Sequence, residues 1–494
     1  MSEIPHSLTM IAGVFKEFDY EVKAVINTFR KPLSHDDFLR ETQEFKPDII
    51  GISMLTMQVL NTYELIGSLK KLGYPVFVGG SHPTVCAVEA IEHGADIAIR
   101  NEGEDTLREI LQGKDLQDIL GITYRRDGEI IENPPRPRIR DLSTLPDPCF
   151  DGFDLKLFEV DGAPKGLNRI YTSRGCPGRC TFCDYQVFGQ KVAYMPMDRV
   201  MKDIQRRVDL FGITKFVVAD DNFTTNKKHV QAFCEGIKKI TPPVTWQAWS
   251  RADCVRPEML EMMKEAGCYM VVFGVESGDA ETLKLTRKGT TVEDNIRAVQ
   301  ISHEAGLQVG VNLMFGFPWE TIKSLDNNLS YINKVWDYTH MFNGSGSLVP
   351  FPGTEIYRQY VEKCGFKNYW LNPKYQDCGV SLYQNAENPY TVSTLSQRFM
   401  YDDTYVQERY FFEYTPEFAE KLSDVAYEVG RHNLETMYPE QPIKRTLFMW
   451  LCKASRFIYR YFPTLEKSIG RFLTTTKRPA IEEQRFKTRG MVPT

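Results

Sequence analysis

Three of the chain's eleven cysteines lie close together in the stretch TSRGCPGRCTFCDYQ, residues 172 to 186. Cys176, Cys180 and Cys183 are separated by three and then by two residues. A structural zinc site requires four protein ligands, commonly from two Cys-x-x-Cys pairs, and this sequence has no second pair. Disulfide frameworks belong to small secreted domains, whereas this chain has 494 residues. Three neighbouring thiolates therefore favour an iron–sulfur cluster, and a four-iron cluster held by three of them keeps one iron open to another ligand.

Polar residues follow several of the apolar runs found between residues 168 and 350. The candidate strands are NRIYTS, KFVVAD, TWQAWS, YMVVFGV, VGVNLMFG and GSGSLVP. After the cysteines of the first run come, in chain order, Asp220, Asp221, Arg251, Glu276, Ser277 and Gly316. Six strands alternating with helices predict a partial (β/α)6 barrel, in which these residues meet at the carboxyl edge of the sheet. Each residue alone could be an ordinary helix cap or turn residue, but their joint placement favours a site.

The first 131 residues also alternate strands and helices. PDIIGIS, YPVFVGG and ADIAIR are predicted buried parallel strands, and the segments between them have helical periodicity. This pattern predicts a doubly wound, Rossmann-like α/β domain, whose ligands bind beyond the carboxyl ends of the strands. The opening SLTMIAGVFKEFDYEVKAVI is predicted as a helix followed by a strand. Since such folds normally open on a strand, we expect the first strand to be missing, either because the domain lacks it or because it was lost to a misplaced start.

Small residues follow two of these strands. The second strand is followed by Gly79, Gly80, Ser81 and His82, and the third by RNEGEDTL. Glycines in such loops allow a flat or phosphate-bearing ligand to approach the backbone. The alternative is that they only turn the chain before the next helix. The spacing alone leaves both interpretations open.

The remaining composition predicts the domain plan and the compartment. We expect a Rossmann-like domain at 1–131, a proline-rich linker at 132–164, the partial barrel at 165–360 and a mainly helical region at 361–494. That last region is expected to cover the barrel mouth. The chain has no secretory leader and no apolar run of the roughly 18 residues that a membrane span needs, so we expect a cytoplasmic protein.

The end of the chain is basic, with twelve Lys or Arg against three Asp or Glu from residue 441 onward. Residues 444–473 are predicted to include a basic amphipathic helix. Such a helix either packs its apolar face on the core or lies on an anionic membrane surface.

The cysteine spacing, with Phe182 directly before the last cysteine, resembles the signature of radical S-adenosylmethionine enzymes. The resemblance implies a 4Fe–4S cluster on Cys176, Cys180 and Cys183. In that family the open iron chelates S-adenosylmethionine, and an electron from the cluster cleaves it to a 5′-deoxyadenosyl radical. The implied contacts to S-adenosylmethionine are Phe182, Asp220, Asp221, Arg251, Glu276, Ser277 and Gly316.

The N-terminal motifs PDIIGIS, VFVGGSHPT and IRNEGEDTL resemble, in order, the cobalamin-binding domain of one subgroup of that family. VPFPGTEIY, residues 349–357, resembles the segment that closes the barrel in the same subgroup. The implied cobalamin contacts are Ser53, Thr56, Gly79, Gly80, Ser81, His82, Glu102 and Gly103. The Asp-x-His-x-x-Gly motif is absent, which implies cobalamin without a protein ligand on cobalt. The alternative is a vestigial domain.

The resemblance further implies radical chemistry on an unactivated carbon of a small-molecule substrate, with cobalamin-dependent C-methylation in a biosynthetic pathway as the expected outcome. Oxidative cyclisation or rearrangement of a tetrapyrrole- or lipid-like substrate is the alternative. A flavodoxin or ferredoxin would donate the low-potential electron, and no nucleic acid partner is expected. A sensory cofactor-binding module and a structural zinc protein also remain open, although neither requires polar residues at the strand ends.

Overall fold

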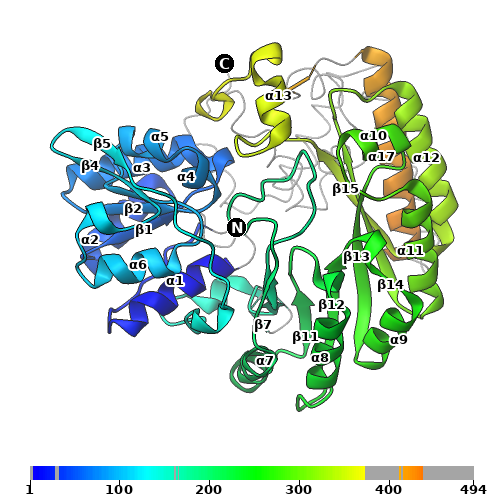
Figure 1. Ribbon diagram of the computed structural model, residues 1–494, viewed down its shortest axis with the longest axis horizontal. Helices are drawn as coiled ribbons and strands as arrows, with labels where there is room; N and C mark the ends of the chain where they lie inside the picture. The colour runs from blue at the N-terminus through cyan, green and yellow to red at the C-terminus, as the bar shows by residue number, and fades with distance from the viewer. Residues whose placement is uncertain are drawn as a thin grey trace, which may run out of the picture.

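The computed structural model consists of two α/β units that lie side by side, with an extended linker running between them (Figure 1). The N-terminal unit is coloured blue to cyan and the second unit green to yellow. The described residues are 4–27, 33–160, 163–164, 166–372, 411–412 and 415–437.

The N-terminal unit contains one five-stranded sheet in the order β1-β2-β3-β4-β5. Its first three strands are parallel and the last two form an antiparallel hairpin. The strands are β1 (Ile50–Ser53), β2 (Val76–Gly79), β3 (Ile97–Ile99), β4 (Ile122–Arg126) and β5 (Glu129–Glu132). The helices are α1 (His6–Glu17), α2 (His35–Phe45), α3 (Val59–Lys71), α4 (Ser81–Val85), α5 (Ala87–Glu92) and α6 (Glu104–Leu111). The three predicted parallel strands are confirmed.

The start of the chain corrects one prediction. No strand precedes α1 within the described residues, so β1 is the edge of the sheet. The strand predicted directly after α1 is wrong, because residues 21–27 have no strand pairing. The backbone of this segment bonds the linker instead, where the Ala24 N–H donates to the Gly152 carbonyl at 2.8 Å. A strand forms only where a neighbouring strand accepts its backbone bonds, and this segment bonds to the linker rather than to the open edge of β1.

The second unit is a six-stranded parallel sheet in the order β15-β14-β13-β12-β11-β8. The strands are β8 (Arg169–Ile170), β11 (Lys215–Val218), β12 (Thr245–Ser250), β13 (Cys268–Glu276), β14 (Gln308–Phe315) and β15 (Met341–Ser347). The outer helices are α7 (Met197–Phe211), α8 (Lys227–Ile237), α9 (Pro257–Glu265), α11 (Val292–Glu304) and α12 (Ile322–Val335), with the shorter α10 (Ala280–Leu285). All six predicted strands are confirmed.

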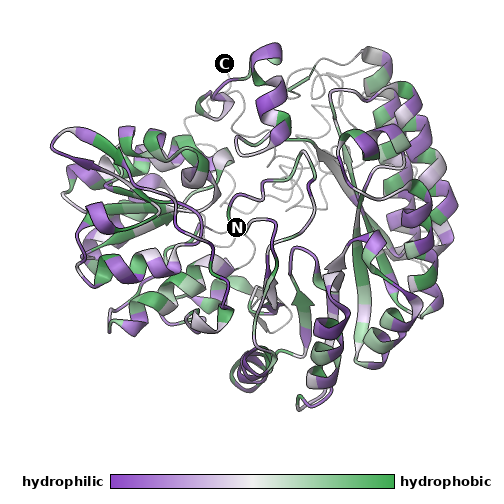
Figure 2. Cartoon of the chain, viewed as in Figure 1, coloured by the Kyte–Doolittle hydropathy of each residue, from purple (hydrophilic) through white to green (hydrophobic). Residues whose placement is uncertain are grey.

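The barrel core lies between the sheet and its outer helices. Phe216, Trp246, Phe273 and Val311 are fully buried, and their registered strands carry one apolar face against the helices. In Figure 2 the strands of this sheet are largely hydrophobic, whereas the outer helices carry hydrophilic residues on part of their surface. Burying this apolar face provides the main driving force for closing the helices onto the sheet.

The described part of the C-terminal region corrects its predicted place. Helix α17 (Pro416–Met437) lies beside α12 and β15 on the outside of the barrel, rather than over its mouth (Figure 1). Asn433 accepts from the Phe342 N–H at 2.8 Å and donates to the Phe342 carbonyl at 2.7 Å. Leu422 and Val425 are buried in the barrel core, so the apolar stripe of α17 belongs to the outer helix layer. The predicted basic helix within 444–473 lies outside the described residues.

The linker packs firmly against both units. Phe150, Phe153 and Phe158 belong to the barrel core. On the other side, the Cys149 N–H donates to the carbonyl of Thr9 in α1 at 2.9 Å. The linker is therefore a structural layer between the units.

Candidate cofactor sites at two sheet edges

The cysteine loop lies between the two short antiparallel strands β9 (Ser173–Arg174) and β10 (Ala193–Tyr194). Gly175 has φ 92°, and a Cβ there would lie 2.8 Å from the Lys191 carbonyl. The Gly178 N–H donates to Cys176 Sγ at 3.5 Å, and a Cβ on Gly178 would lie 3.4 Å from Cys176 Sγ and 3.8 Å from Cys180 Sγ. Glycine backbone therefore wraps around the thiols, which are the ligands that an iron–sulfur cluster requires.

Arg251, which follows β12, brings a positive charge to the thiols. Its Nη1 lies 3.9 Å from Cys180 Sγ. Both oxygens of Asp253 accept from the guanidinium at 3.0 Å, and the Lys288 carbonyl accepts from Nη2 at 2.5 Å. Burial opposes the charge on Arg251, but the Asp253 carboxylate raises its pKa above the ordinary value. Burial raises the pKa of the Cys176 thiol above its ordinary value, and the positive charge of Arg251 opposes this effect.

Glu276, at the end of β13, pairs with a lysine that the sequence analysis missed. Lys288 Nζ donates to Glu276 Oε1 at 2.9 Å, and both side chains are largely buried. Burial would lower the pKa of Lys288, but the neighbouring Glu276 carboxylate and Cys180 thiol raise it above its ordinary value. A Cβ on Gly274 would lie 2.6 Å from Glu276 Oε1 and 3.0 Å from Lys288 Nζ, so this pair requires a glycine there.

Asp220 and Asp221, which follow β11, differ in environment although they are adjacent. Asp220 is fully buried and accepts three bonds of 2.6 Å, from the Thr172 N–H, the Thr172 hydroxyl and the Ser173 hydroxyl. Burial raises the pKa of Asp220 to about 6. Asp221 is exposed, and its carboxylate accepts from the Gly175 N–H at 3.1 Å. Asp220 thus holds the strand before the cysteine loop through hydrogen bonds, whereas Asp221 is an exposed residue beside the loop.

Ser277 and Gly316, which follow β13 and β14, lie in turns that are held by hydrogen bonds to nearby side chains. The Ser277 hydroxyl donates to Asn328 at 3.3 Å, and the Gly278 N–H donates to the same oxygen at 2.7 Å. Gly316 has φ 85°, in the left-handed region that favours glycine. Glu320 holds this turn, because its Oε2 accepts from the Gly316 N–H at 2.7 Å and from the next N–H at 3.1 Å. Burial raises the pKa of Glu320 to about 8.

Glu320 was missed from the sequence, although its position four residues after Gly316 fits a carboxylate that closes a turn. Phe182, between the second and third cysteines, has its ring 5.9 Å from the ring of Phe317 in an edge-to-face contact. The structure thus brings Cys180, Arg251 and the Glu276–Lys288 pair together at one edge. The contacts of all these residues with S-adenosylmethionine remain predictions.

The glycines at the edge of the N-terminal sheet carry no side chain over the turns that follow its strands. Gly80 has φ 107°, and a Cβ there would lie 2.9 Å from the Met54 carbonyl. A Cβ on Gly79 would have no neighbour closer than 3.8 Å, and one on Gly103 none closer than 3.5 Å. Ser53 is exposed at the end of β1, and Ser81 opens α4. This cradle of backbone and small residues fits a cobalamin, which is broad and approaches the backbone closely.

Thr56, His82 and Glu102, which are predicted to contact cobalamin at this edge, are bonded to other groups of the protein. His82 is fully buried, with its Nδ1 3.2 Å from the Thr56 hydroxyl and its Nε2 3.1 Å from Glu89 Oε1. Glu89 also accepts from Trp370 Nε1 at 3.1 and 3.0 Å. Glu102 is buried and its carboxylate pairs with Arg174 of the second unit at 2.8 Å. Thr56, His82 and Glu102 can therefore shape the edge through buried partners, and their contact with cobalamin remains a prediction.

Two family models match this chain. The model described as "Radical SAM superfamily" matches residues 170–332, and the model described as "B12 binding domain" matches residues 3–111. The chain is 30% identical over 367 residues to an uncharacterized methyltransferase of Pyrococcus horikoshii, covering 72% of this chain and 78% of the relative. It is 27% identical over 424 residues to the cytidylyl-2-hydroxyethylphosphonate methyltransferase of Streptomyces wedmorensis, covering 73% and 78%.

Solved structures confirm the predicted fold class. The radical S-adenosylmethionine methyltransferase TsrM of Kitasatospora setae, with cobalamin and a [4Fe-4S] cluster bound, has a TM-score of 0.60 at 21% identity and covers 74% of this chain and 73% of its own. The cobalamin-dependent enzyme OxsB, with aqua-cobalamin and S-adenosylmethionine bound, has a TM-score of 0.64 at 20% identity, covering 96% and 72%. At these identities the similarity establishes the arrangement of the two units.

Proposed function

We propose a C-methylation reaction for this chain, which belongs to the radical S-adenosylmethionine superfamily and to its subgroup with an N-terminal B12-binding domain. Its cofactors are a 4Fe–4S cluster, S-adenosylmethionine and cobalamin. The proposed reaction places a methyl group on an unactivated carbon of a small-molecule substrate. Two similar proteins that span most of this chain are methyltransferases by name, which supports methylation.

The observation that carries the proposal is the convergence of charged side chains beside the cysteine loop. When bound, the cluster supplies the electron that cleaves S-adenosylmethionine, and cobalamin supplies the methyl-transfer chemistry. Cys176, Cys180 and Cys183 would hold the cluster. The chain's other task is to orient a zwitterionic amino acid and to exclude water from the reacting carbon.

Charge complementarity suggests how the amino acid part of S-adenosylmethionine is oriented. Lys288 has three N–H donors, of which one is given to Glu276, so the ammonium can also pair with a substrate carboxylate. The exposed carboxylate of Asp221 and that of Glu276 suit a substrate ammonium. Arg251, held by Asp253, would stay beside the thiols. Phe182, which is partly exposed and packs edge-to-face on the buried ring of Phe317, is the aromatic residue proposed to contact S-adenosylmethionine.

Electron delivery is proposed to come from a low-potential flavodoxin or ferredoxin. Cys183 is exposed, so the cysteine loop reaches the protein surface where a donor could approach. Among the described residues, no helix has the length and apolar character needed to cross a membrane. We propose a cytoplasmic enzyme, and a peripheral membrane contact through 444–473 would involve residues that the structure does not describe.

A second candidate is oxidative cyclisation. The anaerobic magnesium-protoporphyrin IX monomethyl ester cyclase of Cereibacter sphaeroides is 23% identical over 385 residues, covering 74% of this chain and 62% of the relative. This similarity is weaker in identity and in coverage of the relative than that to the two methyltransferases. We therefore place cyclisation second.

The two candidates differ in what becomes of S-adenosylmethionine. The test uses anaerobically reconstituted protein with cobalamin, a low-potential reductant, methyl-¹³C S-adenosylmethionine and a small-molecule extract as substrate source. Methylation predicts 5′-deoxyadenosine and S-adenosylhomocysteine in equal amounts, with ¹³C in a product. Cyclisation predicts 5′-deoxyadenosine without S-adenosylhomocysteine. Formation of neither compound, in protein with a full cluster, would contradict both.

A further inference from the structure

A buried ion pair joins the two units directly before the cysteine loop. Arg174 lies in β9, two residues before Cys176. Its Nη1 donates to Glu102 Oε1 at 2.8 Å, and its Nη2 donates to Glu104 Oε1 at 2.5 Å. Glu102 belongs to the loop after β3 and Glu104 is the first residue of α6, so both carboxylates come from the N-terminal unit. One guanidinium of the barrel is thus held by two carboxylates of the other unit.

Water is largely excluded from this group. The exposed fractions of the side chains are 11% for Arg174, 4% for Glu102 and 6% for Glu104. The second oxygen of Glu102 accepts from the linker N–H of Ile139 at 2.8 Å. A planar guanidinium that pairs with two fixed carboxylates has little orientational freedom, because each nitrogen needs its own acceptor. A buried ion pair is a weak source of stability, and its more characteristic effect is to specify one geometry.

Further contacts connect Arg174 and the linker to the segment that follows the three cysteines. The Arg174 guanidinium lies 5.0 Å from the centre of the Phe188 ring. Arg138 of the linker donates to the Gln186 carbonyl, and Arg140 Nη1 donates to the Lys191 carbonyl at 3.1 Å. The segment that follows the cysteines is therefore hydrogen-bonded to the linker.

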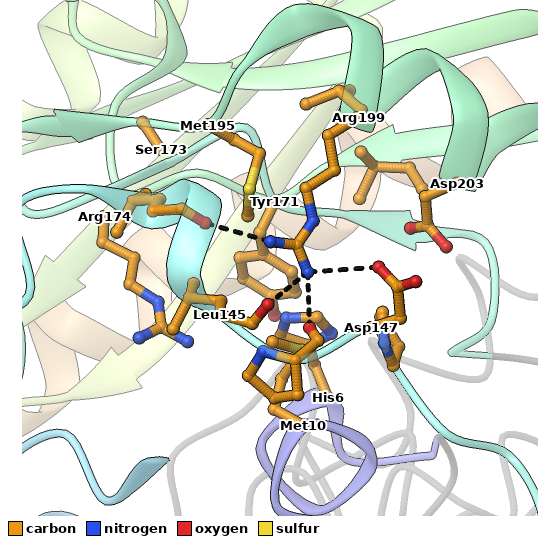
Figure 3. A pocket seen from close by; sticks show the side chains of 15 residues that line it. His6, Met10, Leu145, Asp147, Tyr171, Ser173, Arg174, Met195, Arg199 and Asp203 are labelled. Atoms are coloured by element: carbon orange, nitrogen blue, oxygen red, sulfur yellow. Dashed lines mark hydrogen bonds and ion pairs between the residues drawn. The ribbon is translucent and has the colours of Figure 1, made fainter. Parts of the chain in front are cut away.

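A small cavity of about 40 Å³ beside Arg174 is lined by residues of the N-terminal unit, the linker and the barrel. It is lined by His6 and Met10 of α1, by linker residues, and by Tyr171 and Arg174 of the barrel, and Figure 3 shows these side chains around it. In the same view Arg199 of α7 donates to linker carbonyls. The N-terminal unit, the linker and the barrel are thus in contact with one another around this cavity.

We propose that Arg174, Glu102 and Glu104 form a positioning junction that fixes the distance and orientation between the two cofactor edges. The inference rests on the proposed function, because it concerns the two edges when both are loaded. Glu102 precedes Gly103 at one edge and Arg174 precedes the cysteines at the other, so a shift at either end moves the opposite edge. A misplacement of about 1 Å between reacting groups can slow a reaction on the order of 100-fold.

The decisive variants alter the junction from opposite sides. Arg174→Lys keeps the positive charge but replaces the two-pronged guanidinium with a single ammonium, which cannot serve both carboxylates in the same geometry. Glu104→Gln changes the other unit and lies far from the cysteines in sequence. Arg108→Lys is the matched control, because Arg108 also pairs with two carboxylates, Glu17 at 2.7 Å and Asp105 at 2.8 Å, both in the N-terminal unit, and its further bond goes to the Thr144 carbonyl of the linker at 3.0 Å rather than to the barrel.

The measurement is the magnetic dipolar coupling between the reduced cluster and cob(II)alamin, read by pulsed electron paramagnetic resonance of the full chain. We expect one narrow distance in the wild type and in Arg108→Lys, and a shifted or broadened distance in Arg174→Lys and Glu104→Gln. An unchanged distance in both junction variants would overturn the inference. If Arg174→Lys fails to assemble its cluster, Glu104→Gln alone decides the outcome.

A second readout needs neither cofactor. The Ile139 amide bonds to Glu102, so its hydrogen exchange should accelerate in both junction variants and stay unchanged in Arg108→Lys. Unchanged exchange at Ile139 in both junction variants would overturn the junction itself. Wild-type protein that binds no cobalamin would contradict the proposed function, and the exchange data would then decide separately whether the junction exists.

Discussion

The edge of the barrel and the edge of the N-terminal sheet present their ligands with different chemistry. At the barrel edge, charged side chains point toward the cysteine loop, with Arg251 Nη1 3.9 Å from Cys180 Sγ and Lys288 Nζ 2.9 Å from Glu276. At the N-terminal edge the glycines expose backbone, while His82 and Glu102 are buried and bonded to other groups.

The difference follows from what each edge is expected to hold. A small zwitterion beside a cluster needs directed charges, which only side chains can provide. A broad macrocycle needs space and backbone contacts, so its polar neighbours can be used to join the two units. The buried polar residues of the N-terminal edge therefore have structural partners, and the two edges should respond differently to substitution.

The largest expected effect is the loss of the cluster. Cys180→Ala should abolish iron binding and 5′-deoxyadenosine formation, because two thiolates cannot hold the cluster. Cobalamin binding should persist, since the other edge is unchanged. Iron content, absorbance near 400 nm and a cobalamin titration measure these properties. Cys364→Ser is the control, because Cys364 is exposed at the end of α13 (Glu355–Cys364). If Cys180→Ala still cleaved S-adenosylmethionine, the assignment of the cluster to the barrel edge would be wrong.

A large effect on the pH dependence of stability is expected from Glu320. Its pKa rises from an ordinary value of 4.5 to about 8 through burial, so the folded state binds this proton more tightly than the unfolded state. Its contribution is present at low pH and is lost as the pH rises from about 4.5 to about 8. The free energy of unfolding should fall by about 3 kcal/mol between pH 5 and 8 through this group. Chemical denaturation should show this slope in the wild type and a flatter one in Glu320→Gln; equal slopes would contradict the assignment.

A smaller effect is expected at the N-terminal edge from Gly80→Ala. The side chain would meet the Met54 carbonyl at 2.9 Å, and the backbone has φ 107°, so strain of about 1–3 kcal/mol is expected. Cobalamin affinity should fall while cluster content stays normal. Gly51→Ala in β1 is the matched control, because a Cβ there has no neighbour within 4 Å. Equal cobalamin affinity in the two variants would show that the turn does not shape the edge.

The smallest expected effect on stability, that of Asp221→Asn, distinguishes the two adjacent aspartates. Asp220→Asn should lower the free energy of unfolding by about 1–3 kcal/mol, because an amide cannot accept all three bonds that the carboxylate accepts. Asp221→Asn should leave stability within about 0.5 kcal/mol, since Asp221 is exposed. Its expected effect is weaker binding of S-adenosylmethionine, measured by calorimetry. The reverse pattern would show that Asp220 is the ligand contact.

The strands and the polar residues at their ends were predictable because apolar runs and helical periodicity repeat regularly along both units. The hairpin of β4 and β5 was missed, although Asp127-Gly128 between alternating residues is a strong turn signal and both residues have positive φ, 52° and 87°. The strand predicted after α1 failed because pairing depends on a neighbouring strand, which a local pattern does not reveal.

The orientations of the predicted site residues could not be predicted from spacing. Asp220 and Asp221 are equivalent in sequence pattern, and only the packing of Thr172 and Ser173 separates their roles. Lys288 and Glu320 lie beyond the strand ends, so no strand-end argument would select them. His82 follows a Gly-Gly turn as a ligand contact would, yet its ring faces Thr56 and Glu89. Side-chain direction depends on tertiary contacts that link distant parts of the chain.

The most direct test of the account is one anaerobic preparation assayed for both cofactors and for cleavage. Reconstituted wild-type protein should contain about four irons, the number of a single 4Fe–4S cluster, and one cobalamin. With a low-potential reductant it should convert S-adenosylmethionine to 5′-deoxyadenosine. Stoichiometric zinc in place of iron, or a complete cluster and bound cobalamin with no 5′-deoxyadenosine, would contradict it.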